Sequence, residues 1–132
     1  MTRKTPALLL ALSMGITAPA LAEEPVTATL DADGVQRAAI VLDSYSYTPG
    51  HLIVQAGKPV ELKLTKEGFA PHDFVIDDAA AGFTVKEDVG GDGKTLRFTP
   101  MNPGKFAIYC SKKAPIGKSH REKGMEGVLE VR

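Results

Sequence analysis

Short stretches in which apolar and polar residues alternate, separated by turn-forming residues, run through most of this chain of 132 residues. The clearest is 60–64, where Val60, Leu62 and Leu64 alternate with charged or polar neighbours. Alternation with a period of two is typical of a strand with one buried face, and no stretch of helical period is long enough to predict a helix. Similar stretches lie at 38–42, 52–54, 72–76, 96–98, 106–110 and 128–131.

The spacing of these stretches predicts the fold class. They follow one another at intervals of roughly ten residues, with Gly, Pro, Asp and Asn at the breaks. Short strands at such intervals are typical of an all-β sandwich or barrel, here of about seven to eight strands. The length of the chain allows one domain with a modest core.

The first 22 residues have the features of a secretory signal peptide. Arg3 and Lys4 precede an apolar stretch at 7–18, which is too short to span a bilayer, and Ala20-Leu21-Ala22 forms a small-x-small cleavage pattern. A buried N-terminal helix is the alternative, but the stretch has no polar face. We therefore expect a signal peptide at 1–22 and an exported, periplasmic domain at 23–132, with no membrane span after cleavage.

Export makes a direct prediction about the mature protein. Cleavage after Ala22 should yield a soluble periplasmic product that begins at Glu23. Intact mass spectrometry of the exported protein measures this, and a product that retains residues 1–22 would contradict it.

Charge and motif content narrow the function classes. Without Arg3 and Lys4, the mature part carries 14 basic against 16 acidic groups, a balance that argues against nucleic acid as a partner. The sequence has no Gly-x-Ser-x-Gly motif, no recognisable frame of paired carboxylates and no phosphate-binding glycine loop. We therefore expect that the protein is not an enzyme.

Cys110 is the only cysteine, so the chain has no internal disulfide. In an exported protein such a cysteine pairs with another chain, stays free or binds a ligand. An exposed free thiol is a liability in an oxidising compartment, whereas a metal-bound thiolate is protected. His120 and Met125 follow Cys110 closely, and His72 supplies a second imidazole. Two histidines, a cysteine and a methionine form the donor set of a mononuclear blue-copper electron-transfer site.

The alternation also indicates where the donors point. His72 has the parity of Phe74 and Ile76, and Cys110 ends a strand on the parity of Phe106 and Ile108. Both side chains should therefore face the core, and residues at the ends of different strands can converge at one end of a sandwich.

Plainer explanations exist for each candidate. Cys110 could be a small buried hydrophobe, His72 a core histidine, and Met125 a side chain packed on the last strand. A zinc site could use the same histidines and cysteine, although Met is a poor zinc ligand. His51 has the parity opposite to its apolar neighbours and is expected on the solvent side.

Four motifs together resemble the cupredoxins, the family of plastocyanin and azurin. The motifs are Ala56-Gly-Lys-Pro-Val-Glu-Leu, His72-Asp-Phe, Pro103-Gly-Lys-Phe-Ala-Ile-Tyr-Cys110 and Gly124-Met125-Glu-Gly-Val-Leu-Glu-Val131. The resemblance covers nearly all of the chain from about Ala39. It implies a Greek-key β-sandwich with one mononuclear type 1 copper, held by His72, Cys110 and His120 in the equatorial plane and by Met125 axially.

Two positions depart from the plastocyanin and azurin pattern. Nine residues separate Cys110 from His120, where those proteins have two to four. The insert could bulge outward and leave the ligands in place, or it could loosen the site. Asp73 stands where those proteins usually have asparagine. We expect Asp73 to accept a hydrogen bond from a backbone N–H near Ser111, and its charge to favour Cu(II) over Cu(I).

The implied function is a periplasmic carrier of single electrons through Cu(I)/Cu(II). The alternative is a periplasmic copper-binding protein for copper tolerance, storage or delivery. The expected partner is a redox protein or a copper-handling protein, and an acidic redox protein would suit the basic residues near the ligands. Basic residues around the ligands, offset in this stretch by Glu122 alone, form either a solvated face or a docking rim for an acidic partner. They are Lys112, Lys113, Lys118, Arg121 and Lys123.

Overall fold

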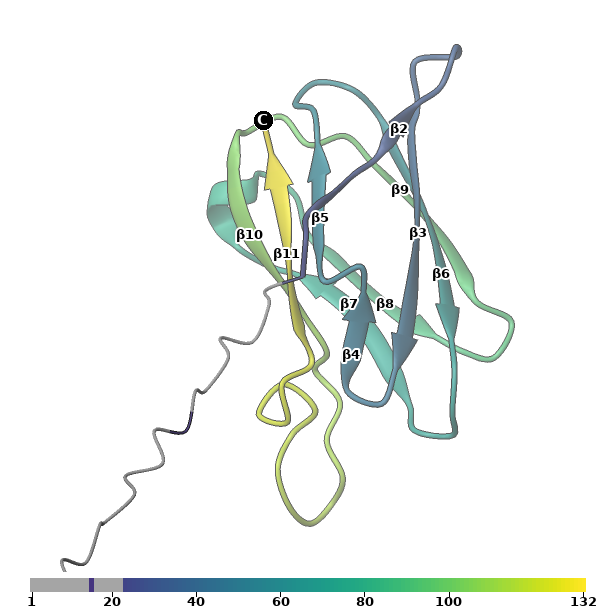
Figure 1. Ribbon diagram of the computed structural model, residues 1–132, viewed down its shortest axis with the longest axis vertical. Helices are drawn as coiled ribbons and strands as arrows, with labels where there is room; N and C mark the ends of the chain where they lie inside the picture. The colour runs from purple at the N-terminus through teal and green to yellow at the C-terminus, as the bar shows by residue number, and fades with distance from the viewer. Residues whose placement is uncertain (1–14, 16–22) are drawn as a thin grey trace, which may run out of the picture.

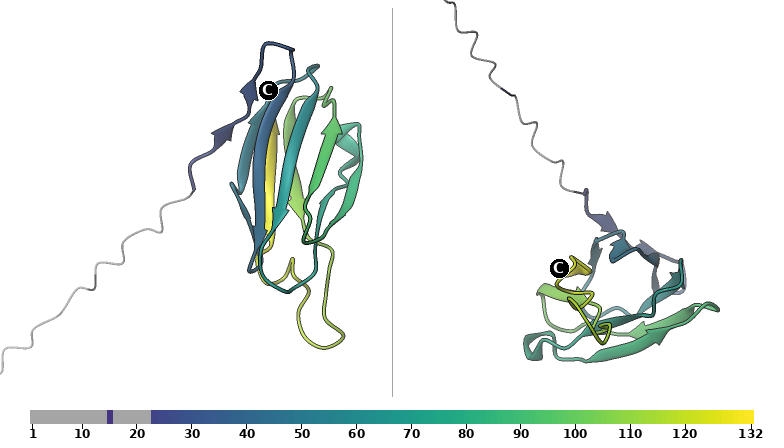
Figure 2. Two further views of the ribbon diagram at one scale, coloured as in Figure 1. Left: turned by 90° about the vertical axis from the view of Figure 1, so that its right-hand side faces the viewer. Right: turned by 90° about the horizontal axis from the view of Figure 1, so that it is seen from below.

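The computed structural model describes Gly15 and residues 23–132. The predicted signal peptide therefore lies, apart from Gly15, outside the described residues. No helix among the described residues combines the length and apolar character needed to cross a bilayer. The described part is built almost wholly from strands, which form two sheets packed face to face (Figures 1 and 2). This architecture confirms the all-β sandwich expected from the alternation.

The first sheet has six strands and holds the segments that carry the candidate ligands. Its order is β1 (Val26–Thr27), β5 (His51–Val54), β11 (Glu126–Val131), β10 (Gly104–Tyr109), β7 (His72–Ile76) and β8 (Val85–Val89). Strand β5 runs parallel to both β1 and β11, whereas the other pairs are antiparallel. Strand β10 lies between β11 and β7, which brings distant parts of the sequence side by side.

The second sheet has five strands. It contains β2 (Thr29–Leu30), β3 (Gln36–Asp43), β6 (Val60–Lys66) and β9 (Lys94–Phe98) in that order, with β4 (Ser46–Thr48) paired to β3. The long pair β3–β6 is parallel, so the chain must leave the sheet between them and return. It does so through β5, which belongs to the first sheet.

The core lies between the sheets, and the alternation places it there. In β6, Val60, Leu62 and Leu64 are buried while Lys63 and Thr65 are exposed. Strand β7 differs because all five of its residues are buried, so both of its faces are covered. Other fully buried core residues are Ile40, Leu42, Leu52, Phe74, Ile76, Ile108 and Leu129.

The structure has more strands than the seven to eight expected. All seven predicted segments are strands, and the additional ones are β1, β2, β4 and β8. Three of these are only two or three residues long. Strand β8 escaped prediction because it is charged: Glu87 occupies the position between the two buried valines, Val85 and Val89, so the apolar alternation is broken. The only helical segment described is a single 3-10 turn, η1 (Ala79–Ala81).

The connection between β10 and β11 is the largest irregular feature of the described chain. In Figure 1 it is the yellow-green loop that extends beyond the lower end of the sandwich, and the left view of Figure 2 shows the same projection. The β3–β4 and β6–β7 connections lie at this end as well (Figure 1). The candidate ligands belong to this end of the molecule.

Candidate metal centre

Strand ends place three of the four candidate ligands, and His120 lies within the connection between β10 and β11. His72 is the first residue of β7, and Cys110 directly follows β10, its antiparallel neighbour in the sheet. His120 and Met125 lie in the connection that leads into β11. All four side chains are buried, with exposed fractions of 2% for His72, 0% for Cys110, 4% for His120 and 0% for Met125. The predicted inward direction of His72 and Cys110 is therefore confirmed.

Three donors converge on one point. The Nδ1 atoms of His72 and His120 lie 4.0 and 3.5 Å from Cys110 Sγ. One donor atom from each residue falls within 4.8 Å of the other two. With bonds of about 2.1 Å to nitrogen and 2.3 Å to sulfur, as at zinc, two ligands of one ion lie about 3.6–3.8 Å apart at tetrahedral to trigonal angles. The observed spacing therefore fits three ligands of a single metal ion.

Met125 is tied to the same cluster through its backbone. Its carbonyl accepts from Cys110 N at 3.2 Å, and its own N–H donates to the His120 carbonyl at 3.0 Å. The side chain is fully buried and belongs to the core cluster that includes Cys110. Met125 is thus held next to both loop ligands by the chain itself.

Asp73 fixes the start of the connection between β10 and β11, here called the ligand loop because it holds His120 and Met125. Its Oδ1 accepts from Ser111 N at 2.7 Å, and its Oδ2 accepts from the Ser111 hydroxyl. The expected bond to a backbone N–H near Ser111 is therefore confirmed. Tyr47 adds a bond from the other sheet, since its hydroxyl donates to the Asp73 carbonyl at 2.7 Å. Such partners hold ligands in a fixed orientation.

The nine-residue insert closes on itself before it reaches His120. Lys113 and Ser119 form an isolated antiparallel bridge, and His120 N donates to the Lys112 carbonyl at 2.9 Å. Ser119 and Glu122 then exchange bonds, each backbone N–H donating to the side chain of the other residue at 2.7 and 3.1 Å. These contacts return the chain to the cluster, so the insert bulges outward while His120 stays in place.

Burial determines the protonation of the donors. Desolvation lowers the pKa of His72, with the charges of His120 and Lys66 adding to the effect. Desolvation also lowers the pKa of His120, and Lys123 contributes. Both imidazoles are therefore neutral near pH 7, the form that binds a metal. Desolvation raises the pKa of the Cys110 thiol, so a metal must displace its proton to bind there.

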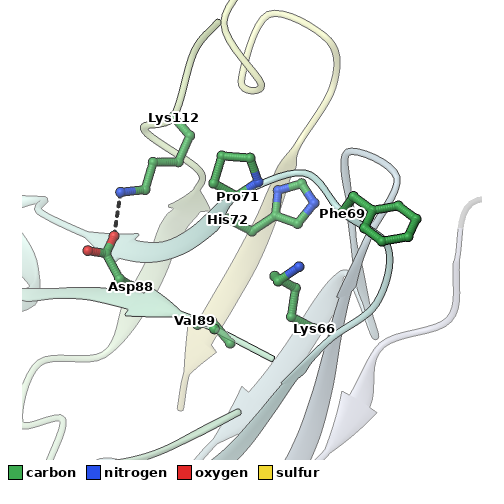
Figure 3. A pocket seen from close by; sticks show the side chains of 8 residues that line it. Lys66, Phe69, Pro71, His72, Asp88, Val89 and Lys112 are labelled. Atoms are coloured by element: carbon green, nitrogen blue, oxygen red, sulfur yellow. Dashed lines mark ion pairs between the residues drawn. The ribbon is translucent and has the colours of Figure 1, made fainter. Parts of the chain in front are cut away.

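A hollow of about 380 Å³ lies beside His72 (Figure 3). It is lined by residues that include Lys66, Phe69, Pro71 and Lys112, and Figure 3 shows the imidazole between Pro71 and Phe69. Lys66 donates to the Gly68 carbonyl at 2.7 Å. His72 also lines the hollow, and its Nε2 atom is buried and has no hydrogen-bond partner among the described residues.

The basic residues around the ligands, here called the basic rim, carry less uncompensated positive charge than the sequence indicates. They are Lys112, Lys113, Lys118, Arg121 and Lys123. Glu122 is the only acidic residue within this stretch, but carboxylates from outside it also approach the basic side chains in space. Lys112 pairs with Asp88 of β8 at 2.5 Å, and Arg121 pairs with Glu126 at 2.5 Å. The pair of Lys112 with Asp88 forms only when β8 is in place, so the local sequence around the ligands could not reveal it.

His51 is not part of the cluster. It is half-buried at the start of β5, where its Nε2 lies 2.7 Å from Glu130 Oε2. The structure therefore confirms that His51 lies apart from the ligands, although its imidazole contacts Glu130 instead of facing only solvent. Met101 is 64% exposed and likewise lies outside the core.

Tyr45 contacts both histidines and was missed by the sequence analysis. Its ring lies edge-on to the His120 ring at 4.9 Å and to the His72 ring at 6.2 Å. It comes from the turn between β3 and β4, in the opposite sheet. Its neighbours Ser44 and Ser46 are polar, so no periodic signal pointed inward; only the assembled sandwich brings it to the site.

Comparison with known proteins supports the fold. A family model described as a cupredoxin-like domain matches residues 7–120, a span that includes His72, Cys110 and His120. None of the curated proteins compared with the chain matches it.

Several solved structures share this fold. The metal binding domain of the Cu(I) exporting P-type ATPase CopA from Streptococcus pneumoniae D39 is 26% identical; the match covers 84% of this chain and 98% of that chain, with a TM-score of 0.63. A copper binding protein in its apo form is 18% identical; the match covers 84% of this chain and 100% of that chain, also with a TM-score of 0.63. A fern plastocyanin is 23% identical; the match covers 72% of this chain and 100% of that chain, with a TM-score of 0.53. The second and third likenesses concern the fold alone.

Proposed function

The chain belongs to the cupredoxin-like family, and from this premise we propose that it is a mononuclear copper protein that carries single electrons. In this proposal copper would be held by the neutral Nδ1 atoms of His72 and His120, by the thiolate of Cys110 and, more weakly, by the thioether of Met125. This donor set suits copper rather than zinc, because a thioether is a poor zinc ligand and a common axial copper ligand. Bound copper would supply the reversible Cu(I)/Cu(II) couple.

The observation that carries the proposal is a buried cluster of converging donor atoms. The two imidazoles are held at 4.0 and 3.5 Å from the sulfur, and no ligand is more than 4% exposed. Ligands that are locked by packing resist rearrangement when the charge on the metal changes. A carrier needs this property because each turnover changes that charge by one.

The same burial argues for a carrier over a delivery protein. Handing copper to a partner requires the partner's donor atom to reach the metal. An electron, by contrast, can cross a layer of packed side chains. The Tyr45 ring packs edge-on against the His120 ring at 4.9 Å, and such packing would hinder access of a donor atom more than it would hinder electron exchange. In this proposal the copper would serve electron transfer, and its four candidate ligands would all be protein side chains.

The second candidate is a copper-binding protein for tolerance, storage or delivery. One observation favours it: the 26% identical structure is described as the metal binding domain of a Cu(I) exporting ATPase. The donor set alone serves both functions, so the two differ in what the reduced protein does with its copper.

We further propose export to the periplasm and an acidic one-electron redox partner. Lys113 and Lys118 are exposed on the ligand loop, and Lys123 follows His120. Local positive charge accelerates the approach of an anionic partner even when the net charge of the whole chain is small.

The test compares electron exchange with copper loss. Ferricyanide, an anionic one-electron oxidant, should oxidise the Cu(I) form rapidly, and the rate should fall as salt rises because the screening length shortens to about 8 Å near 0.15 M. The Cu(I) form should meanwhile keep its metal against a moderate Cu(I) chelator. Stopped-flow absorbance measures both processes. Rapid loss of Cu(I) together with slow oxidation would support the copper-handling function instead. As a control, Lys118→Glu should weaken the salt dependence without changing copper retention.

A further inference from the structure

The turn between β3 and β4 places a bulky residue in an unfavourable backbone conformation. Ser44 and Tyr45 have φ values of 24° and 65°. Two-residue hairpin turns of this kind favour Asn-Gly because both positions require positive φ. A bulky aromatic residue with positive φ is a genuine outlier. Such conformations persist where the surroundings enforce them, and they concentrate at functional sites.

Local bonds hold the turn in this conformation. Asp43 Oδ1 accepts from Ser44 N at 2.7 Å and from the Ser44 hydroxyl at 3.1 Å. The Ser46 hydroxyl donates to the Asp43 carbonyl at 3.0 Å. The result is that the Tyr45 side chain is carried from the second sheet onto the end of the first.

The Tyr45 ring lies against both imidazoles of the candidate centre. Its edge-to-face contacts have centroid distances of 4.9 Å to His120, at an interplanar angle of 72°, and 6.2 Å to His72, at 87°. This is a favourable geometry for aromatic pairs. Tyr45 is itself half-buried and packs on the core cluster. Its position leaves His120 only 4% exposed although His120 lies at the end of a long loop.

A second contact joins Tyr45 to the ligand loop. Lys123 Nζ lies 4.4 Å from the centroid of the Tyr45 ring and 3.3 Å from the hydroxyl, to which it donates. A cation over an aromatic face is attracted to the ring. Since Lys123 follows His120 by three residues, the ring contacts both the ligand and the segment that carries it.

We propose that Tyr45 is a positioning residue that closes the metal centre: its ring holds His120 against Cys110 and shields both histidines from competing ligands. The proposal rests on the copper centre proposed above and specifies what retains the metal there. Ring packing carries the effect, while the contact of Lys123 with the hydroxyl is secondary because it lies at the exposed surface.

Three substitutions at this turn distinguish the effect of the Tyr45 ring from the effect of the backbone conformation. Tyr45→Gly removes the ring and relieves the positive φ. Ser44→Gly relieves φ at the neighbouring residue and keeps the ring. Tyr45→Phe keeps the ring and removes the bond from Lys123. If the ring closes the site, only Tyr45→Gly should open it.

Two measurements test the closure. In the Cu(I)-loaded full mature chain, Tyr45→Gly should speed transfer of copper to a chelator about tenfold or more, since two aromatic contacts are lost. Ser44→Gly and Tyr45→Phe should stay within about twofold of the wild type, because both keep those contacts. In the apoprotein, Tyr45→Gly should raise amide hydrogen exchange across residues 111–123, while Ser44→Gly should not.

Equal copper transfer and equal exchange in the Tyr45→Gly variant and the wild type would overturn the proposal. So would a Tyr45→Phe variant that loses copper as fast as Tyr45→Gly, because the hydroxyl rather than the ring would then be responsible. If the wild type takes up no copper, the proposed function fails, and the apoprotein exchange measurement alone decides whether Tyr45 closes the loop.

Discussion

Replacing Cys110 by serine should abolish the intense visible absorption that we expect from the Cu(II) form. The band requires charge transfer from a thiolate sulfur to the metal, and a hydroxyl cannot provide that donor. Cys110 Sγ is also the atom on which both histidine nitrogens converge, at 4.0 and 3.5 Å. Its loss removes the centre of the donor set, so Cu(II) affinity should fall by orders of magnitude. Optical and EPR titration with Cu(II) measures both effects.

The fold must survive for this result to be informative. Cys110 is fully buried, and placing a hydroxyl at such a site costs roughly 1–3 kcal/mol. The apo variant should therefore melt at a lower temperature than the wild-type apoprotein while retaining the circular dichroism of a β-sandwich. A variant that unfolds outright would be replaced by Cys110→Ala, which adds no buried polar group.

A matched control comes from the histidines. His51→Ala removes an imidazole that is paired with Glu130, away from the cluster, so the spectrum and the affinity should match the wild type. His72→Ala should weaken binding sharply because it removes one of the three converging donors. A visible band that survives Cys110→Ser, or one that disappears in His51→Ala, would contradict the assigned centre.

Much of the fold was predictable because one-sided burial leaves a pattern. The alternation in 60–64 reports a strand with one face on the core, and parity alone placed His72 and Cys110 inward. The pattern fails where a charged residue interrupts the apolar positions or where a strand is very short. Strand β8 carries Glu87 between two buried valines, and β1 and β2 are too short to show a period.

The candidate site was predictable only in part, for a different reason. The donors are rare residue types, so His72, Cys110, His120 and Met125 stand out in the sequence. The residues that support them are common types, and they become partners through contacts distant in sequence. Asp88 reaches Lys112 only because β8 borders β7, and Tyr45 reaches His120 only because two sheets meet at one end.

Asp73 is the exception, since its role was expected from its place beside His72. Alternation alone would turn it away from the core face that His72 occupies. It is nevertheless only 1% exposed, because the segment after β10 covers it and donates two hydrogen bonds from Ser111. Asp73 thus combines two effects at the centre: it fixes the ligand loop, and it places a carboxylate beside the cluster.

Asp73→Asn should raise the reduction potential of the copper centre. The variant keeps an amide oxygen to accept from Ser111 N, and its NH₂ group can donate to the Ser111 hydroxyl, so the loop should stay in place. It removes the carboxylate, whose negative charge favours Cu(II). The expected shift is on the order of 0.1 V, the scale of the interaction with one nearby unit charge at an effective dielectric constant of about 20. Direct electrochemistry of the two proteins measures the shift.

Asp73→Ala separates the charge of Asp73 from its hydrogen bonds. It removes the same charge but also leaves the Ser111 N–H and hydroxyl without their acceptor. Hydrogen bonds to a charged group contribute about 1.5–3 kcal/mol each, so the free energy of unfolding of Asp73→Ala should fall by several kcal/mol, whereas that of Asp73→Asn should fall by much less. Denaturant unfolding of the apoproteins gives these values without copper. If the charge sets the potential, both variants should show a similar positive shift despite their different stabilities. A shift confined to Asp73→Ala would instead mean that the order of the ligand loop, not the carboxylate, controls the balance between Cu(I) and Cu(II).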